Sequence, residues 1–172
     1  MPKKEIVPKK DVPQKKDKIF LNILWIGFVV GTLDGIGAIL SAYKAGPVII
    51  FQFIASGAFG KATFKGGMPM FWWGIWFHYF IAYSFTAVFY VAYPSFYKFF
   101  RNKYLIGLEY GIITWIVMNF IVVPTSKIGF HPIKNVLPIL IGIGILIICV
   151  GMPIALIADF IRKRKLMAKN LK

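Results

Sequence analysis

Acidic residues are scarce in this 172-residue sequence, which has six Asp and Glu against 21 Lys and Arg. Cysteine is nearly absent, and the single Cys149 lies in an apolar run, which excludes a disulfide framework or a cysteine-based metal site. The two histidines, His78 and His131, lie in separate segments, which argues against a metal or haem site. We therefore expect neither a metal nor a cofactor.

The motifs of common enzyme classes are also missing. The sequence has no GxSxG nucleophile elbow, no HExxH zinc-binding helix and no GxxxxGKS/T phosphate loop. Without these motifs, no residue is singled out as a nucleophile or a general base. We expect that the protein is not an enzyme.

Apolar residues dominate what is present. Hydrophobic residues make up 58% of the chain and aromatic residues 17%, and the mean hydropathy is +0.70. A soluble domain of this length has too small a core to bury so much apolar surface, so part of that surface must face lipid. The basic residues cluster near the ends and in short connections, which is typical of a membrane protein and argues against nucleic-acid binding.

Four apolar stretches are long enough to cross a bilayer, which takes about 20 residues. A further apolar run, Pro47–Phe59, is shorter and predicts an interfacial or re-entrant helix. We expect an all-α integral membrane protein with four transmembrane helices and this extra helix. The predicted organisation is a disordered basic cytoplasmic tail at 1–18, one transmembrane domain at 19–161 with spans at about 19–43, 70–93, 104–124 and 137–160, and a basic cytoplasmic tail at 162–172.

The distribution of Lys and Arg predicts the orientation. The two tails and the connection 94–103 carry 16 basic residues, whereas the other two connections carry 5. Because cytoplasmic segments are enriched in Lys and Arg, both termini should be cytoplasmic. Anionic lipids should contact the basic tails.

Three polar residues of the predicted spans form a candidate site. Asp34 and His78 should lie at nearly the same depth below the outer surface, since each helical residue advances about 1.5 Å, and Asn119 lies close to the same level. Proximity would favour a charged Asp34–His78 pair, whereas burial would favour neutral forms. Two interpretations stay open: a functional polar cluster, or hydrogen bonds that only hold helices together.

A second group of charged residues lies near the expected cytoplasmic surface. Glu109 and Asp159 are close in sequence to basic residues at the ends of their spans, which predicts interfacial ion pairs with Arg101, Lys103 and Arg162. Contact between these basic residues and anionic lipid is the alternative.

Small residues at helical spacing predict where helix backbones approach closely. Small side chains allow the backbones of two membrane helices to approach closely. The predicted packing positions are Gly27, Gly31, Gly35, Gly74, Ala82, Gly107, Gly111 and Gly151.

Four segments carry a resemblance to a known group of proteins. GTLDGIGAIL, FQFIASGAFGK, FHYFIAYSFTAVFYVAYP and WIVMNFIVVPTS resemble small bacterial inner-membrane proteins of the YagU-like group. The resemblance implies a bacterial inner-membrane location and four helices. It brings no catalytic residues with it.

Two functions are compatible with these features. One is a transport-like or stress-related membrane protein whose Asp34, His78 and Asn119 cluster opens to the outer side. The other is a structural or assembly subunit that docks on a larger membrane-protein complex, or that forms a homo-oligomer, through its small-residue faces.

Overall fold

The computed structural model describes residues 15–130 and 135–170, and this part of the chain is almost entirely helical, with no strand. Two π-helical segments and one 3-10 helix interrupt or connect the α-helices. The elements in chain order are α1 (Lys15–Ser41), α2 (Gly46–Phe59), the 3-10 helix η1 (Lys61–Lys65), α3 (Gly67–Phe100), α4 (Lys103–Val117), the π-helical η2 (Met118–Val122), α5 (Val123–Thr125), α6 (Val136–Leu146), the π-helical η3 (Ile147–Gly151) and α7 (Met152–Asn170).

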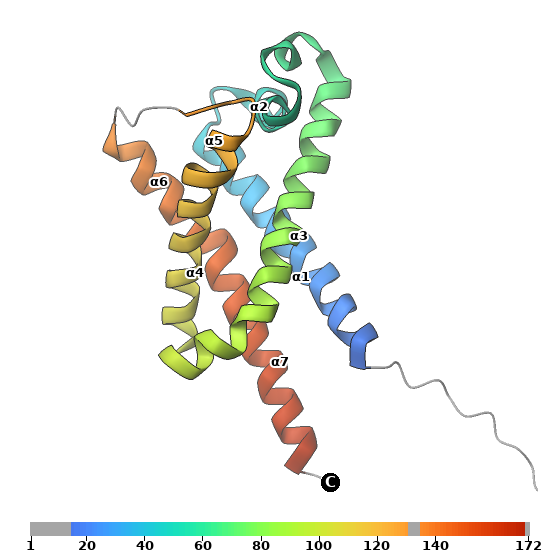
Figure 1. The fold of residues 1–172 in the computed structure, drawn as a ribbon, viewed down its shortest axis with the longest axis vertical. Coiled ribbons are helices and arrows are strands. Elements are labelled where there is room, and N and C mark those ends of the chain that lie inside the picture. Colours follow the sequence, from blue (N-terminus) through green and yellow to red (C-terminus); the bar gives the residue numbers. More distant parts are fainter. Residues whose placement is uncertain (1–14, 131–134, 171–172) are drawn as a thin grey trace, which may run out of the picture.

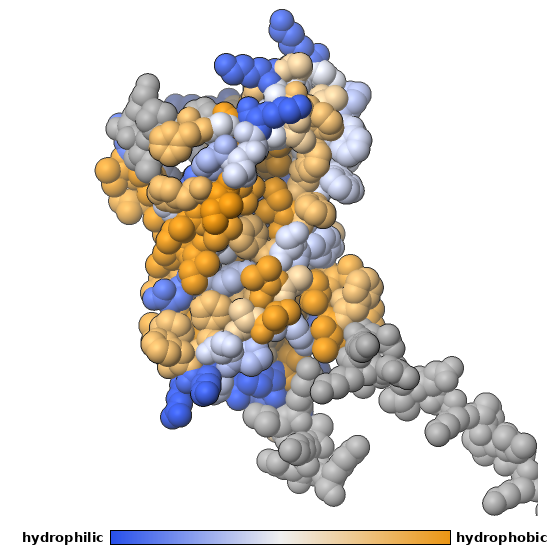
Figure 2. All heavy atoms as spheres, in the orientation of Figure 1, coloured by the Kyte–Doolittle hydropathy of each residue, from blue (hydrophilic) through white to orange (hydrophobic). Residues whose placement is uncertain are grey.

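Four of these helical units are long and apolar enough to span a membrane: Ile19–Ser41, Gly67–Phe100, Lys103–Thr125 and Val136–Arg164. The predicted fold class, an all-α multi-pass membrane protein, is therefore confirmed. Figure 1 shows the four units side by side, and Figure 2 shows hydrophobic residues over the middle of the bundle with hydrophilic residues at both ends.

The predicted short helix is present as α2, the shorter apolar helix of the structure. Pro47 lies in its first turn, where the missing N–H costs nothing. The helix lies at one end of the bundle, together with α5 and η1 (Figure 1). Two hydrogen bonds fix it there: Gln52 Nε2 donates to the carbonyl of Gly67 (2.9 Å), and the backbone N–H of Lys127 donates to the carbonyl of Gly57 (2.8 Å).

The connection predicted at residues 94–103 is much shorter than expected. Helix α3 continues through Pro94 to Phe100, and only Arg101 and Asn102 separate it from α4. Arg101 adopts the left-handed conformation (φ 49°) that ends α3, and the Asn102 side chain accepts a hydrogen bond from the N–H of Tyr104 (2.9 Å) to cap α4.

The bounds of the predicted tails also differ from those in the structure. Residues 162–170 are not a separate tail, because α7 continues through them to Asn170. Residues 15–18 belong to α1. The remainder of the predicted N-terminal tail lies outside the described residues.

The buried core occupies the half of the bundle opposite α2. The core joins α1, α3, α4 and the η3–α7 unit. Within it the rings of Phe89 and Tyr110 make an edge-on contact, with 4.6 Å between the ring centres. Its members are Ile26, Val30, Phe89, Tyr93, Ile106, Tyr110, Val150, Ile154, Ala155 and Ala158.

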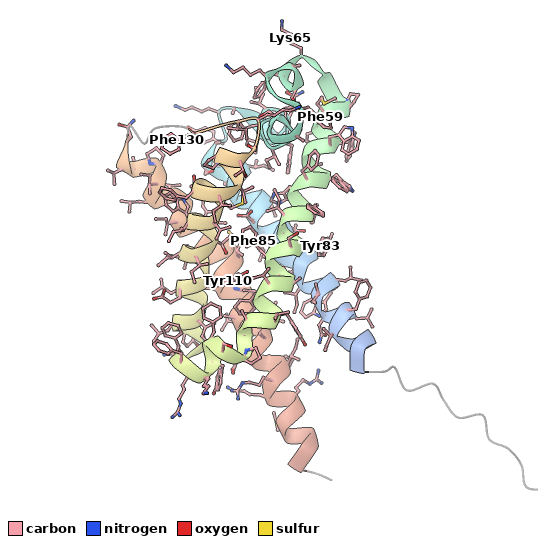
Figure 3. The ribbon with its side chains drawn as sticks, viewed as in Figure 1. Phe59, Lys65, Tyr83, Phe85, Tyr110 and Phe130 are labelled. Atoms are coloured by element: carbon pink, nitrogen blue, oxygen red, sulfur yellow. The ribbon has the colours of Figure 1, made fainter. Side chains whose placement is uncertain are left out.

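Tyr110 also ties two helices together by a hydrogen bond. Its hydroxyl donates to the carbonyl of Phe85 (2.6 Å), and both residues are labelled in Figure 3. Tyr110→Phe should lower the free energy of unfolding by about 1 kcal/mol, because it removes this bond and keeps the ring. Tyr83→Phe is the matched control, since the Tyr83 hydroxyl forms no hydrogen bond within the described residues. Thermal unfolding of both variants in detergent gives the comparison, and equal losses would contradict a stabilising role for this bond.

The predicted small residues lie where helices approach each other. A Cβ atom added to Gly31 would lie 3.0 Å from the Tyr79 ring and 3.1 Å from Ala82 of α3, and one added to Gly27 would overlap Tyr83. A Cβ atom at Gly111 would lie 2.6 Å from Cα of Ile147. The same close approach holds for the other predicted glycines: Gly35 against His78, Gly74 against the backbone of Phe51, and Gly107 and Gly151 against each other.

Candidate functional site

One cavity in the bundle is lined by all three residues of the predicted polar cluster: Asp34, His78 and Asn119. Its volume is about 420 Å³. Helix α2 also contributes to the lining, through Phe53 and Ile54. The remaining lining residues are mostly apolar and come from every spanning unit: Val30, Ala38, Ser41, Ile81, Ala82, Phe85, Thr114, Trp115, Met118, Val123, Pro138, Gly142, Ile145, Leu146 and Val150.

His78 is held in one orientation by a backbone carbonyl of another helix. The side chain is buried, and its Nε2 lies 2.7 Å from the carbonyl oxygen of Gly31. A carbonyl oxygen only accepts, so Nε2 must carry the proton and donate. The approach is close because Gly31 and Gly35 have no side chains, and a Cβ atom at Gly35 would lie 3.2 Å from Nε2. Nδ1 is left as the second hydrogen-bonding atom of the ring.

Asp34 lies one turn beyond Gly31 on α1 and is half-buried. Its carboxylate interacts electrostatically with His78, but no hydrogen bond or ion pair joins the two within the described residues. A direct Asp34–His78 pair, one of the alternatives left open by the sequence, is therefore not formed, and the Nε2 proton of His78 is donated to Gly31 instead. Asp34 is thus an acid in a mainly apolar cavity with no directly bonded partner among these residues, an arrangement that is costly in a membrane.

Asn119 and Thr114 add two more polar groups to the cavity. The Asn119 side chain donates to the carbonyl of Trp115 on its own helix (2.9 Å) and makes no hydrogen bond to Asp34 or His78. Thr114 is buried, and its hydroxyl makes no hydrogen bond of good geometry among the described residues, although it lies close enough to Tyr110 to interact with that side chain. The sequence analysis does not predict Thr114 as a site residue, although this residue follows Gly107 and Gly111 on one helix face.

Both π-helical segments contribute to the cavity lining, η2 through Met118 and Asn119 and η3 through Val150. Each segment ends two residues before a proline, Pro124 or Pro153. Proline has no N–H and its ring collides with the carbonyl four residues back, so widening the preceding turn relieves the conflict. The prolines therefore explain why the helices widen beside the cavity, and they change the directions in which the lining side chains point.

At the end of the bundle remote from α2, only some of the charged residues form ion pairs. Asp159 is buried and pairs with Nη2 of Arg162 (2.9 Å) and Nζ of Lys163 (3.1 Å). Glu109, Arg101 and Lys103 form no ion pair within the described part of the chain.

The predicted pairing of Glu109 fails for a geometric reason. Glu109 lies six residues into α4 from Lys103, about 9 Å along the axis and on a different face of the helix. Lys103 instead lies over the ring of Tyr104, with Nζ 5.0 Å from the ring centre.

No group of three or more His, Cys, Asp or Glu residues that could hold a metal occurs in the described ranges 15–130 and 135–170. Comparison of the chain with protein families, with curated proteins and with solved structures gives no match. The resemblance to YagU-like proteins accordingly stays a prediction.

Proposed function

We propose that this chain is a non-enzymatic, transport-like membrane protein that admits a small solute or protons to the cavity lined by Asp34, His78 and Asn119. On this proposal the cavity opens to the outer side, and both termini face the cytoplasm, as the distribution of basic residues favours. The resemblance to bacterial inner-membrane proteins supports that membrane as its location.

The observation that supports this proposal most directly is the polar content of an otherwise apolar cavity. Asp34 has no directly bonded partner, and the hydroxyl of Thr114 makes no hydrogen bond of good geometry, within the described residues. Polar groups placed in a membrane domain are expensive unless they are bonded or hydrated. A solute or water that bonds to them would remove this cost, whereas groups that only held helices together would be bonded to each other.

The acid and imidazole also have the chemistry for proton exchange. His78 keeps Nδ1 available while Nε2 is bonded to Gly31, and Asp34 lies within electrostatic range of the ring. A carboxylate and an imidazole in one hydrated cavity can accept and release protons in turn.

His78→Ala should lower proton or solute flux in liposomes by about tenfold, equivalent to about 1.4 kcal/mol, because it removes the ring and its bond to α1. Ser84→Ala is the matched control, since Ser84 is an exposed polar residue of the same helix that bonds only to the carbonyl of Phe80 (2.8 Å). Flux is read with a pH-sensitive dye inside the vesicles. Unchanged flux in a correctly folded His78→Ala protein would remove the cavity from the proposal.

The second candidate function is an assembly subunit, and the surface of α6 favours it. A Cβ atom at Gly144 would meet nothing within 4 Å, and Leu140 and Ile148 are exposed on the same unit. Small residues facing outward from a membrane helix suit contact with another helix. Co-purification in mild detergent with a larger protein at fixed stoichiometry would favour this function, and a monodisperse single chain would favour the transport-like one.

A further inference from the structure

A second cavity, of about 390 Å³, lies at the end of the bundle remote from α2. It is built from the last turns of α3 and the middle of α7. Its lining is Tyr90, Tyr93, Pro94, Tyr97, Ala158, Ile161 and Arg162. None of these residues takes part in the Asp34 cavity.

Arg162 is fixed in this second cavity but is not fully bonded. Its guanidinium lies over the ring of Tyr97, 3.8 Å from the ring centre, and Nη2 donates to Asp159. Its Nε is buried and makes no hydrogen bond of good geometry in the part of the chain that the structure describes, although the guanidinium also interacts with the Tyr93 hydroxyl. Stacking and the ion pair therefore orient the guanidinium while leaving donor capacity unused.

Tyr93 supplies a second unused polar group. The residue is 8% exposed, and its hydroxyl makes no hydrogen bond of good geometry among the described residues. Tyr90 is held differently, because Asn22 Nδ2 of α1 donates to its hydroxyl (3.3 Å). The Tyr93 hydroxyl and the Arg162 guanidinium are close enough to interact with each other, but neither Tyr93 Oη nor Arg162 Nε makes a hydrogen bond of good geometry among the described residues. Two neighbouring donors of this kind can both be satisfied by one acceptor bound between them.

The charge balance at this place favours an anion. Asp159 is bonded to both Arg162 and Lys163, so two positive charges stand against one negative charge. The donors are a guanidinium and a phenol, which suit the oxygens of a phosphate group. The cavity also offers Pro94, Ala158 and Ile161 as apolar walls beside the charged group.

We propose that this second cavity is a binding site for a phosphate group, to which Arg162 and the hydroxyl of Tyr93 both donate hydrogen bonds. Two sources can supply that group: the headgroup of an anionic phospholipid, whose chains would follow the apolar walls outward, or free inorganic phosphate. The site is independent of the Asp34 cavity and of any transport through it.

The test measures binding of fluorescent phosphatidic acid to the full-length protein in neutral detergent, with fluorescent diacylglycerol, which has no phosphate, as the comparison. Arg162→Gln should weaken binding by more than tenfold, and Tyr93→Phe by roughly threefold to tenfold, because each removes donors to the phosphate. Arg164→Gln is the matched control: it removes the same charge from the same helix at an exposed residue outside the cavity lining.

Inorganic phosphate added as a competitor distinguishes the sources. Competition at millimolar concentration assigns the site to free phosphate, and lipid binding that resists phosphate but needs Tyr93 and Arg162 assigns it to the lipid headgroup. Equal weakening by Arg162→Gln and Arg164→Gln would overturn the proposal, because it would indicate a diffuse basic surface. Equal binding of diacylglycerol would also overturn it. Tyr93→Phe keeps the test valid if Arg162→Gln unfolds, since it preserves the ring and the charges.

Discussion

Gly151→Ala is expected to lower the free energy of unfolding by at least about 1–3 kcal/mol. A Cβ atom at this position would overlap the carbonyl oxygen of Gly107 and would lie 2.9 Å from the backbone N of Gly111. Both obstacles are backbone atoms of α4, so no side chain can rotate to make room. The α4 and η3–α7 units would have to separate along the contact that holds the buried core together.

Gly144→Ala is the matched control for this prediction, because Gly144 lies on the same helical unit and its added Cβ would meet nothing within 4 Å. Alanine is favoured over glycine in a helix by roughly 0.5–1 kcal/mol, so this variant should be neutral or slightly more stable. Thermal unfolding of both variants in detergent measures the difference. Equal effects would show that the close backbone contact does not limit stability.

Gly74→Ala is expected to separate α2 from the bundle. The added Cβ atom would overlap the backbone of Phe51. The free energy of unfolding should again fall by at least about 1–3 kcal/mol. Because Phe53 and Ile54 of α2 line the Asp34 cavity, the displacement should also change solute access to it.

Gly57→Ala serves as the control on α2 itself, since its Cβ would make ordinary contacts at 3.5 Å with Ser126. Limited proteolysis near Lys61, together with flux in liposomes, should distinguish the two variants. A Gly74→Ala protein whose α2 stays protected and whose flux is normal would show that α2 does not depend on this contact.

The spanning units could be predicted from sequence because each is an apolar run longer than a bilayer requires. The end of α3 could not, since a proline after an apolar run usually marks a helix end. Here the helix continues past Pro94 because Phe96, Tyr97 and Phe100 pack against the core. The close contacts of the glycines were predictable from their spacing, whereas the identity of each partner required the structure.

For the candidate site, only the depth of each residue along its helix could be predicted from the sequence. Counting residues from the helix ends brought Asp34, His78 and Asn119 to one level, and all three line one cavity. The hydrogen bond from His78 to a backbone carbonyl was not predictable, because every helical residue offers a carbonyl and sequence spacing does not show which one lies beside the ring. The π-helical segments were likewise hidden, although Pro124 and Pro153 were the available signals.

If the cavity lined by Asp34, His78 and Asn119 is hydrated and open to the outer side, a thiol placed in it should react with a reagent added from that side. In a Cys149→Ser background, three single cysteines are compared: Asn119→Cys in the cavity, Phe120→Cys beside it but outside the lining, and Lys127→Cys in the following connection. A membrane-impermeant thiol reagent is added to the outer face of intact cells.

Labelling is expected at positions 127 and 119, because thiol modification needs the hydrated thiolate. None is expected at position 120, whose side chain would face lipid. Labelling at 127 without labelling at 119 would contradict a hydrated, open cavity, since the cavity would then be dry and its polar residues would serve only to join helices.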